Sequence, residues 1–298
     1  MNQKIIGAVL IIFSALGFGS MTIFATYAYR GGITVATMLF IRFCIATVIL
    51  FIYVGFRYGR PQVRGKDFFA LFILGAVFYT TQSSFYLTAI RYISASLAAI
   101  ILYIFPLFVA GLSIVFFRER LKAKTVVAMA LSFLGLAFVL WTSFASIDYR
   151  GVLLALGAAL IYSLYIVLGN KVVRDLPAPV MSAFISLFTA AGIFCYGSLS
   201  GQLHFDFQAT AWSPVIGLAL FSTVLAMLFF FRGLEIVGPT NAAILSMAEP
   251  LFTVVLSVVL LGETLLFQQI LGGAAILGGA GLVIASQNEK STRNEEYI

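Results

Sequence analysis

Apolar runs of about 20 residues recur along the whole chain, and short segments with charged residues, Pro or Gly separate them. About 20 helical residues cross the ~30 Å hydrocarbon core of a bilayer, so each run predicts a membrane-spanning α-helix. The predicted helices cover residues 5–27, 34–55, 68–89, 94–117, 125–141, 151–169, 179–199, 212–231, 240–261 and 267–286. The pattern therefore predicts an all-α membrane protein with ten transmembrane helices and a polar, disordered tail at residues 287–298.

The basic residues in the loops predict how the helices are oriented. If the N-terminus is cytoplasmic, 14 of the 18 Lys and Arg residues fall on the cytoplasmic side, and only Arg30, Arg91 and Arg150 fall on the other side. This is the distribution that the positive-inside rule describes, so both termini are expected in the cytoplasm. We expect a multi-pass protein of the cytoplasmic (inner) membrane of a bacterium.

The second half of the chain repeats the first half at a spacing of 144 residues. The clearest copy pairs residues 97–118 with residues 241–262, with Pro106 opposite Pro250 and Ser113 opposite Ser257. Each half then holds five helices, and because five is odd, the second half enters the membrane from the opposite side. The predicted units are residues 1–145 and 146–286, an inverted repeat of the kind on which secondary transporters are built.

Two charges lie inside predicted helices, Arg42 and Glu249. A charge at the centre of a spanning helix costs at least ~2.5 kcal/mol, which makes both residues candidates for a functional site. At ~1.5 Å per residue, Glu249 lies about 14 Å from the cytoplasmic surface and Arg42 about 12 Å from the opposite surface. We expect them to face the bundle interior, where they either pair or bind the two charged ends of a zwitterionic substrate. A permanent ion pair, or bonds to backbone freed by Pro250, is the structural alternative.

Polar and aromatic residues in other predicted helices complete the candidate site. The polar run in the third helix contains Tyr79 and Gln82, which are three residues apart and share a helix face. For each aromatic residue, interhelical packing is the alternative role. The predicted substrate-binding residues are Arg42, Tyr79, Gln82, Tyr103, Tyr162, Ser246 and Glu249, and the predicted helix-kink or gating residues are Pro106 and Pro250.

Composition narrows the function classes. Hydrophobic residues make up 62% of the chain and charged residues 10%, against about 25% charged residues in soluble globular proteins. The net charge of +7 is distributed over loops and forms no predicted nucleic-acid-binding face. The sequence has a single histidine and no G-x-x-x-x-G-K-[ST] loop, so no metal, other cofactor, ATP site or enzymatic activity is predicted.

Several short motifs together resemble a known family. They are Pro-Leu-Phe at 106–108 and 250–252, Ile-Arg-Phe at 41–43, Arg-Glu-Arg-Leu at 118–121 and Gly-Glu-Thr-Leu at 262–265, with Gly-rich fifth and tenth helices. In this combination, residues 5–286 resemble the EamA-type members of the drug/metabolite transporter superfamily. The resemblance implies a carrier of two five-helix repeats that moves small metabolites, often exporting amino acids, without ATP.

The expected function is therefore secondary transport by alternating access, with export of amino acids or related zwitterions. The expected partners are a small-molecule substrate and the lipid bilayer, and no nucleic acid. The alternatives are a lipid-linked substrate carrier or flippase of the same superfamily, and a membrane subunit that transports nothing. Small-xxx-small pairs in the tenth helix, such as Ala275 with Gly279, leave both a monomer and a homodimer open.

Overall fold

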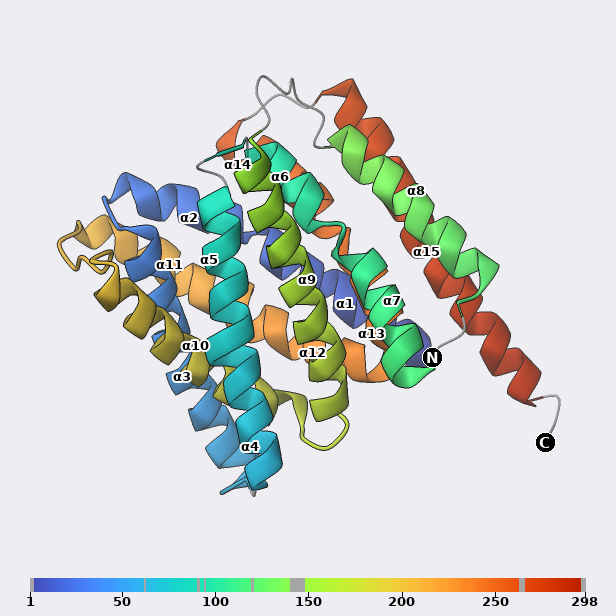
Figure 1. Cartoon of the computed structure of the whole chain (residues 1–298), viewed down its shortest axis with the longest axis horizontal. Helices are drawn as coiled ribbons and strands as arrows, with labels where there is room; N and C mark the ends of the chain where they lie inside the picture. The colour runs from blue at the N-terminus through green and yellow to red at the C-terminus, as the bar shows by residue number, and fades with distance from the viewer. Residues whose placement is uncertain are drawn as a thin grey trace.

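The computed structural model describes residues 3–61, 63–89, 92–93, 95–118, 121–139, 148–262 and 266–295, and within these ranges it contains helices and no strands. The predicted residue Arg91 and the motif residues 119–120 and 263–265 lie outside the described residues. The helices are α1 Gln3–Gly19, α2 Met21–Arg30, α3 Val35–Tyr58, α4 Gly65–Phe72, η1 Ile73–Tyr79, α5 Thr80–Ala89, α6 Ala95–Leu102, α7 Phe105–Phe117, α8 Ala123–Val139, α9 Tyr149–Val172, α10 Ala178–Leu199, η2 Ala209–Ala211, α11 Trp212–Ala219, η3 Leu220–Leu225, α12 Ala226–Val237, α13 Pro239–Ser246, α14 Glu249–Leu261 and α15 Phe267–Glu295 (Figure 1).

Eight of the described helical segments are long and apolar enough to cross a membrane, and two shorter apolar helices, Phe105–Phe117 and Ala123–Phe138, accompany them. Each of the ten overlaps one of the apolar runs predicted from the sequence. The structure is thus that of an all-α, multi-pass membrane protein.

Three of the predicted helices are interrupted, whereas the sequence predicts that they are continuous. The first helix stops at Gly19 and restarts at Met21. The other two interruptions lie next to Pro106 and Pro250, where the sequence predicts kinks. Each proline is instead the second residue of a new helix, α7 or α14. Proline has no backbone N–H, and the first turn of a helix does not need one, so proline begins a half-helix without losing a hydrogen bond.

The repeat of 144 residues is visible in these half-helices. Adding 144 to the bounds of α6 gives the bounds of α13, and adding 144 to the bounds of α7 gives those of α14. Two π-helical segments, η1 and η3, also lie at overlapping repeat positions, because 73–79 shifted by 144 is 217–223. Short π segments inside helices are frequent at functional sites.

Helices α8 and α15 form a closely packed pair at one side of the molecule (Figure 1). A Cβ atom at Gly135 would lie 2.5 Å from the Gly272 carbonyl oxygen, and one at Gly279 would lie 2.8 Å from the Ala128 oxygen. The small residues of the tenth predicted helix are therefore used to approach α8 of the same chain.

Helix α15 also continues to Glu295, where the sequence predicts a disordered tail from Gln287. Gln, Glu, Lys and Arg are good helix formers, and they allow the last helix to extend beyond its apolar part. Residues 296–298 lie outside the described part of the chain.

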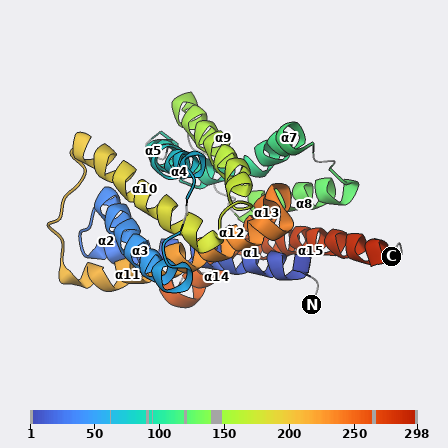
Figure 2. The same ribbon diagram turned by 90° about the horizontal axis from the view of Figure 1, so that it is seen from below.

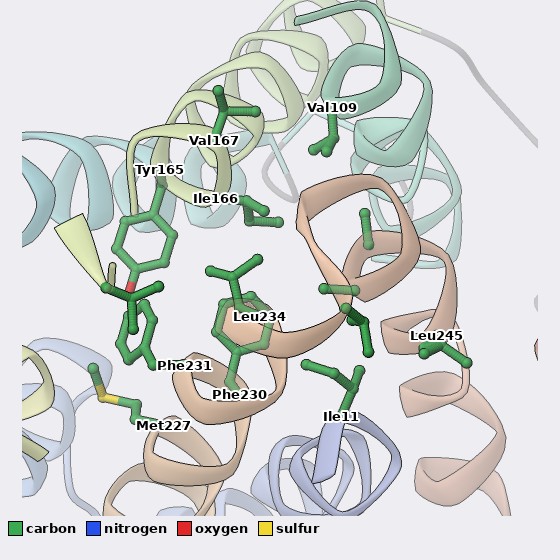
Figure 3. Close-up of a cluster of buried hydrophobic side chains, with 14 of the residues drawn as sticks. Ile11, Val109, Tyr165, Ile166, Val167, Met227, Phe230, Phe231, Leu234 and Leu245 are labelled. Atoms are coloured by element: carbon green, nitrogen blue, oxygen red, sulfur yellow. The ribbon is translucent and has the colours of Figure 1, made fainter. Parts of the chain in front are cut away.

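The largest buried cluster lies where α1, α7, α9, α12 and α13 meet. It contains Ile11, Val109, Ile166, Leu234 and Leu245, which Figure 3 shows together. Seen from below, α10 lies beside α3, away from the α8 and α15 pair (Figure 2). The core thus includes the half-helices α7 and α13, which border the two chain breaks next to Tyr103 and Glu249.

Candidate substrate site

Glu249 is the first residue of α14, directly after the break that follows α13. The first turn of a helix carries unpaired N–H groups and a positive partial charge, which stabilises a carboxylate there. The Glu249 residue is half-buried although it lies in the middle of a membrane-spanning segment. The chain break therefore places a carboxylate with some accessible surface at the centre of the bundle.

The end of α1 holds this break in position. Thr253 Oγ1 contacts two carbonyl oxygens, that of Gly19 at 3.1 Å and that of Glu249 at 3.2 Å. A Cβ atom at Gly19 would lie 2.9 Å from the Glu249 carbonyl oxygen and 3.1 Å from the Phe252 Cβ. Only glycine permits α1 to approach α14 this closely, so the position of Glu249 depends on Gly19.

Arg42 of α3 is completely buried, with 0% of its surface exposed. Its Nε donates to Thr223 Oγ1 at 2.6 Å, its Nη2 donates to the Ser222 carbonyl oxygen at 3.1 Å, and its Nη1 lies 2.9 Å from Met21 Sδ. The guanidinium carbon is 4.8 Å from the centre of the Phe43 ring. Neutral groups and one aromatic ring thus surround the guanidinium.

The partners of Arg42 come from the π-helical segment η3. Thr223 Oγ1 donates back to the Leu218 carbonyl oxygen, five residues earlier, at 3.2 Å, and so is free to accept from Arg42. Among the described residues, no carboxylate forms an ion pair with Arg42. A buried charge without an opposite charge is costly, which is typical of a site that receives a charged ligand.

A chain of ring contacts runs from Arg42 toward Glu249. Successive ring centres are 5.2, 6.0, 6.0, 4.8 and 6.0 Å apart. We call this set the aromatic arc, and its members in order are Phe43, Tyr79, Tyr165, Tyr162, Phe105 and Tyr103. At its far end the Tyr103 hydroxyl interacts with the Glu249 carboxylate, and the Arg42 charge also acts electrostatically on that carboxylate.

The predicted site residues differ in how they relate to this arc. Tyr79, Tyr103 and Tyr162 belong to it. Gln82 is half-buried and accepts from the Ser83 hydroxyl at 3.3 Å, and Ser246 is buried at the last residue of α13. Within the described part of the chain, no hydrogen bond or ring contact joins Gln82 or Ser246 to the arc.

Two further tyrosines outside the predicted set lie near the site. Tyr165 is the middle member of the arc, and it follows Tyr162 by three residues, the spacing that places two side chains on one helix face. Tyr86 lies close enough to Glu249 to interact with its charge. It lies seven residues after Tyr79, two helical turns along the same face, and this periodicity was the available signal.

Four other polar residues of the third predicted helix line a different cavity. Thr80, Ser83, Ser84 and Thr88 line a separate pocket of about 200 Å³ between α3, α5 and α10. The polar side chains of this helix therefore lie on two of its faces, and only the face with Tyr79 contributes to the aromatic arc.

The two ends of the site are packed differently. We call the end of the bundle that carries Arg57, Lys66, Arg118, Lys171 and Arg232 the basic end. Toward this end, α7 packs against α9 and α13. The corresponding pair under the shift of 144 residues is α14 and α6, and these make no comparable contact in the described ranges, because α14 packs on α1 and α2 while α6 packs on α9. The site is thus closed toward the basic end.

Several known proteins of similar sequence carry the description uncharacterized transporter. An "Uncharacterized transporter" of Archaeoglobus fulgidus is 29% identical over 94% of this chain and 96% of its own length. The "Uncharacterized transporter YetK" of Bacillus subtilis is 26% identical over 84% of this chain and 78% of its own length. A solved crystal structure has the same fold, with a TM-score of 0.80 at 20% identity, and the match covers 93% of this chain and 95% of that one.

The sequence profile described as the EamA-like transporter family matches this chain twice, over residues 5–141 and 149–285. The two matches start 144 residues apart, which is the spacing of the half-helices and of the repeat in the sequence. Together they cover most of the chain. The protein is a membrane transporter, and the chain belongs to the EamA-like transporter family.

Proposed function

We propose that the protein is a secondary transporter of amino acids or related zwitterions, and that it exports them across the cytoplasmic membrane. The observation that carries this proposal is the arrangement of Arg42 and Glu249 at the two ends of one aromatic arc. In this arrangement Arg42 binds the substrate carboxylate and Glu249 binds the ammonium group. The arc between them offers ring faces to the ammonium group and to apolar side chains.

Access to Arg42 requires a local change. Met21, the first residue of α2, covers the guanidinium through a thioether sulfur, which is a weaker acceptor than a carboxylate oxygen. A substrate carboxylate replaces this contact by a charge-assisted hydrogen bond. Because Met21 directly follows the break between α1 and α2, it moves without disturbing α1, which holds Glu249.

Transport then proceeds by alternating access in a protein of ten transmembrane helices arranged as two inverted five-helix repeats. The basic end faces the cytoplasm, as the positive-inside rule predicts. The conformation described above has its site closed toward the cytoplasm. In the opposite state the packing is exchanged, so that α6 and α14 approach each other while α7 and α13 separate.

A carrier of lipid-linked substrates or a flippase is the second candidate, but the site favours it less. Such a substrate carries phosphate groups that several cations would bind, whereas Arg42 is the single cation at the aromatic arc among the described residues. The carboxylate of Glu249 would repel those phosphates. A zwitterion uses both charges.

Flux in proteoliposomes tests this function. Vesicles that contain the purified protein are loaded with one unlabelled amino acid at a time, and the entry of the same labelled amino acid is measured by counterflow. We expect counterflow for at least one zwitterion, and its loss in both Arg42→Gln and Glu249→Gln, with Lys66→Gln at the exposed basic end as the control. Scrambling of a labelled lipid without any amino-acid counterflow would favour the second candidate.

A further inference from the structure

Two fully buried polar side chains lie between the aromatic arc and the basic end without a hydrogen-bond partner. Within the described residues, neither Ser113 Oγ of α7 nor either amide atom of Asn170 of α9 has a partner. Both residues are 0% exposed. Nearly all buried polar side-chain atoms in proteins are hydrogen-bonded, so each of these exceptions requires an explanation.

The two side chains lie at the same level on neighbouring helices. Helices α7 and α9 are in register with an offset of 57 residues: the Phe105 and Tyr162 rings are 4.8 Å apart at one end, and the Arg174 guanidinium is 5.6 Å from the Phe117 ring at the other. Val109 and Ile166 lie in the same buried cluster between these two levels (Figure 3). The offset places Ser113 and Asn170 one turn further toward the basic end. We call these two residues, which lie at one level between the arc and the basic end, the polar step.

This polar step lies in the part of the bundle that seals the site. Helix α7 packs there against α9 and α13, whereas at the other end α14 and α6 make no comparable contact within the described residues. Burying an amide or hydroxyl without a hydrogen bond disfavours the closed arrangement. Opening of this end would restore hydrogen bonds to both residues, because water or a substrate could then reach them.

The repeat supplies an independent comparison. Under the shift of 144 residues, Ser113 corresponds to Ser257 of α14 and Asn170 corresponds to Thr26 of α2. Thr26 is half-buried, and its hydroxyl donates to the Thr22 carbonyl oxygen at 2.8 Å. Ser257, like Ser113, is buried. Thr26 at the loosely packed end is thus partly accessible and hydrogen-bonded, whereas its counterpart Asn170 at the sealed end is neither.

We propose that Ser113 and Asn170 line the cytoplasmic half of the substrate path and bind the polar groups of the substrate, or water, when that half opens. This inference rests on the proposed function, since it takes the basic end as one of the two openings. The Asn170 amide offers both a donor and an acceptor, and Ser113 adds a hydroxyl. This step therefore fits a small substrate with both hydrogen-bonding capacities, such as the ammonium and carboxylate of a zwitterion.

Cysteine labelling tests the proposal without knowledge of the substrate. Cys44 and Cys195, both free, are replaced by alanine, and Ser113→Cys is then treated with a membrane-impermeant maleimide from the cytoplasmic face. The matched control is Ser132→Cys, because Ser132 is also fully buried and unpartnered but lies in the α8 and α15 contact. A minor open state is commonly populated at 0.1–10%, and opening of this end exposes the thiol of Ser113→Cys but not that of Ser132→Cys. We therefore expect Ser113→Cys to react at least about tenfold faster. Equal rates would overturn the proposal.

A second variant separates a path residue from a packing residue. Asn170→Leu keeps the size of the side chain and removes its polar atoms, so it favours the sealed state. We expect it to slow labelling of Ser113→Cys about tenfold, the change that 1.4 kcal/mol produces in an equilibrium, with labelling of Ser132→Cys unchanged. Unchanged labelling of Ser113→Cys would contradict a role in the path. These measurements require no transport, so a wrong proposed function would appear separately, as absent counterflow in the unmodified protein.

Discussion

The burial of Arg42 makes a quantitative prediction for Thr223→Val. Thr223 Oγ1 accepts from Arg42 Nε at 2.6 Å, and both residues are 0% exposed. Valine has the same shape as threonine but no hydroxyl, so the substitution leaves a charged N–H group buried without an acceptor. A hydrogen bond to a charged group contributes about 1.5–3 kcal/mol. At about 2 °C per kcal/mol for a chain of this size, the melting temperature should fall by roughly 3–6 °C.

The assay is thermal unfolding of the detergent-solubilised protein, followed by intrinsic fluorescence. Thr189→Val is the matched control, because Thr189 is also 0% exposed and its hydroxyl donates to a neutral group, the Gly75 carbonyl oxygen, at 3.3 Å. A neutral hydrogen bond contributes about 0.5–1.5 kcal/mol, so the control should lose roughly 1–3 °C. If Thr223→Val lost no more than Thr189→Val, the guanidinium would not depend on η3, and the description of the Arg42 site would be wrong.

Three further predictions concern the elements around the site. Gly19→Ala should abolish counterflow and lower the melting temperature, because its Cβ would lie 2.9 Å from a backbone oxygen of α14. The control Gly55→Ala, which has open space around it, should change neither. Equal behaviour of the two variants would refute the close contact. Tyr103→Phe removes the hydroxyl that faces the site carboxylate, so we expect about tenfold weaker substrate binding by fluorescence titration, and unchanged affinity would contradict this contact. Gly279→Leu should lower the melting temperature by forcing α15 away from α8, whereas Gly281→Leu, at a position with open space, should not. An unchanged melting temperature of Gly279→Leu would show that the two helices need not approach so closely.

Much of the fold follows from the sequence because membrane helices are long and apolar. Ten apolar runs correspond to the ten helical segments that the structure describes as spanning or apolar. The breaks within the helices were missed, since an apolar run has the same composition whether or not it is continuous. Proline next to Glu249 signalled a disturbance there, but the sequence alone does not distinguish a kink from a restart.

The candidate site was predicted in part. Arg42 and Glu249 stood out because charges are rare inside apolar runs, and Tyr79, Tyr103 and Tyr162 lie where they could link the two. The partners of Arg42 could not be predicted, because they come from a π segment whose hydrogen-bonding pattern is not visible in local sequence. The unpartnered state of Asn170 could not be predicted either, since it depends on three-dimensional packing.

The central claim is that Glu249 binds the ammonium group of a zwitterion whose carboxylate binds Arg42. The most direct test measures binding of three ligands to the unmodified protein and to Glu249→Gln: the transported amino acid, its analogue without the amino group, and its amide. The unmodified protein should prefer the amino acid to both analogues by about 10–100-fold, as expected for hydrogen bonds to charged groups. Glu249→Gln should lose its discrimination against the analogue without the amino group and keep its discrimination against the amide. If Glu249→Gln discriminated against both analogues as strongly as the unmodified protein, Glu249 would not be the ammonium ligand.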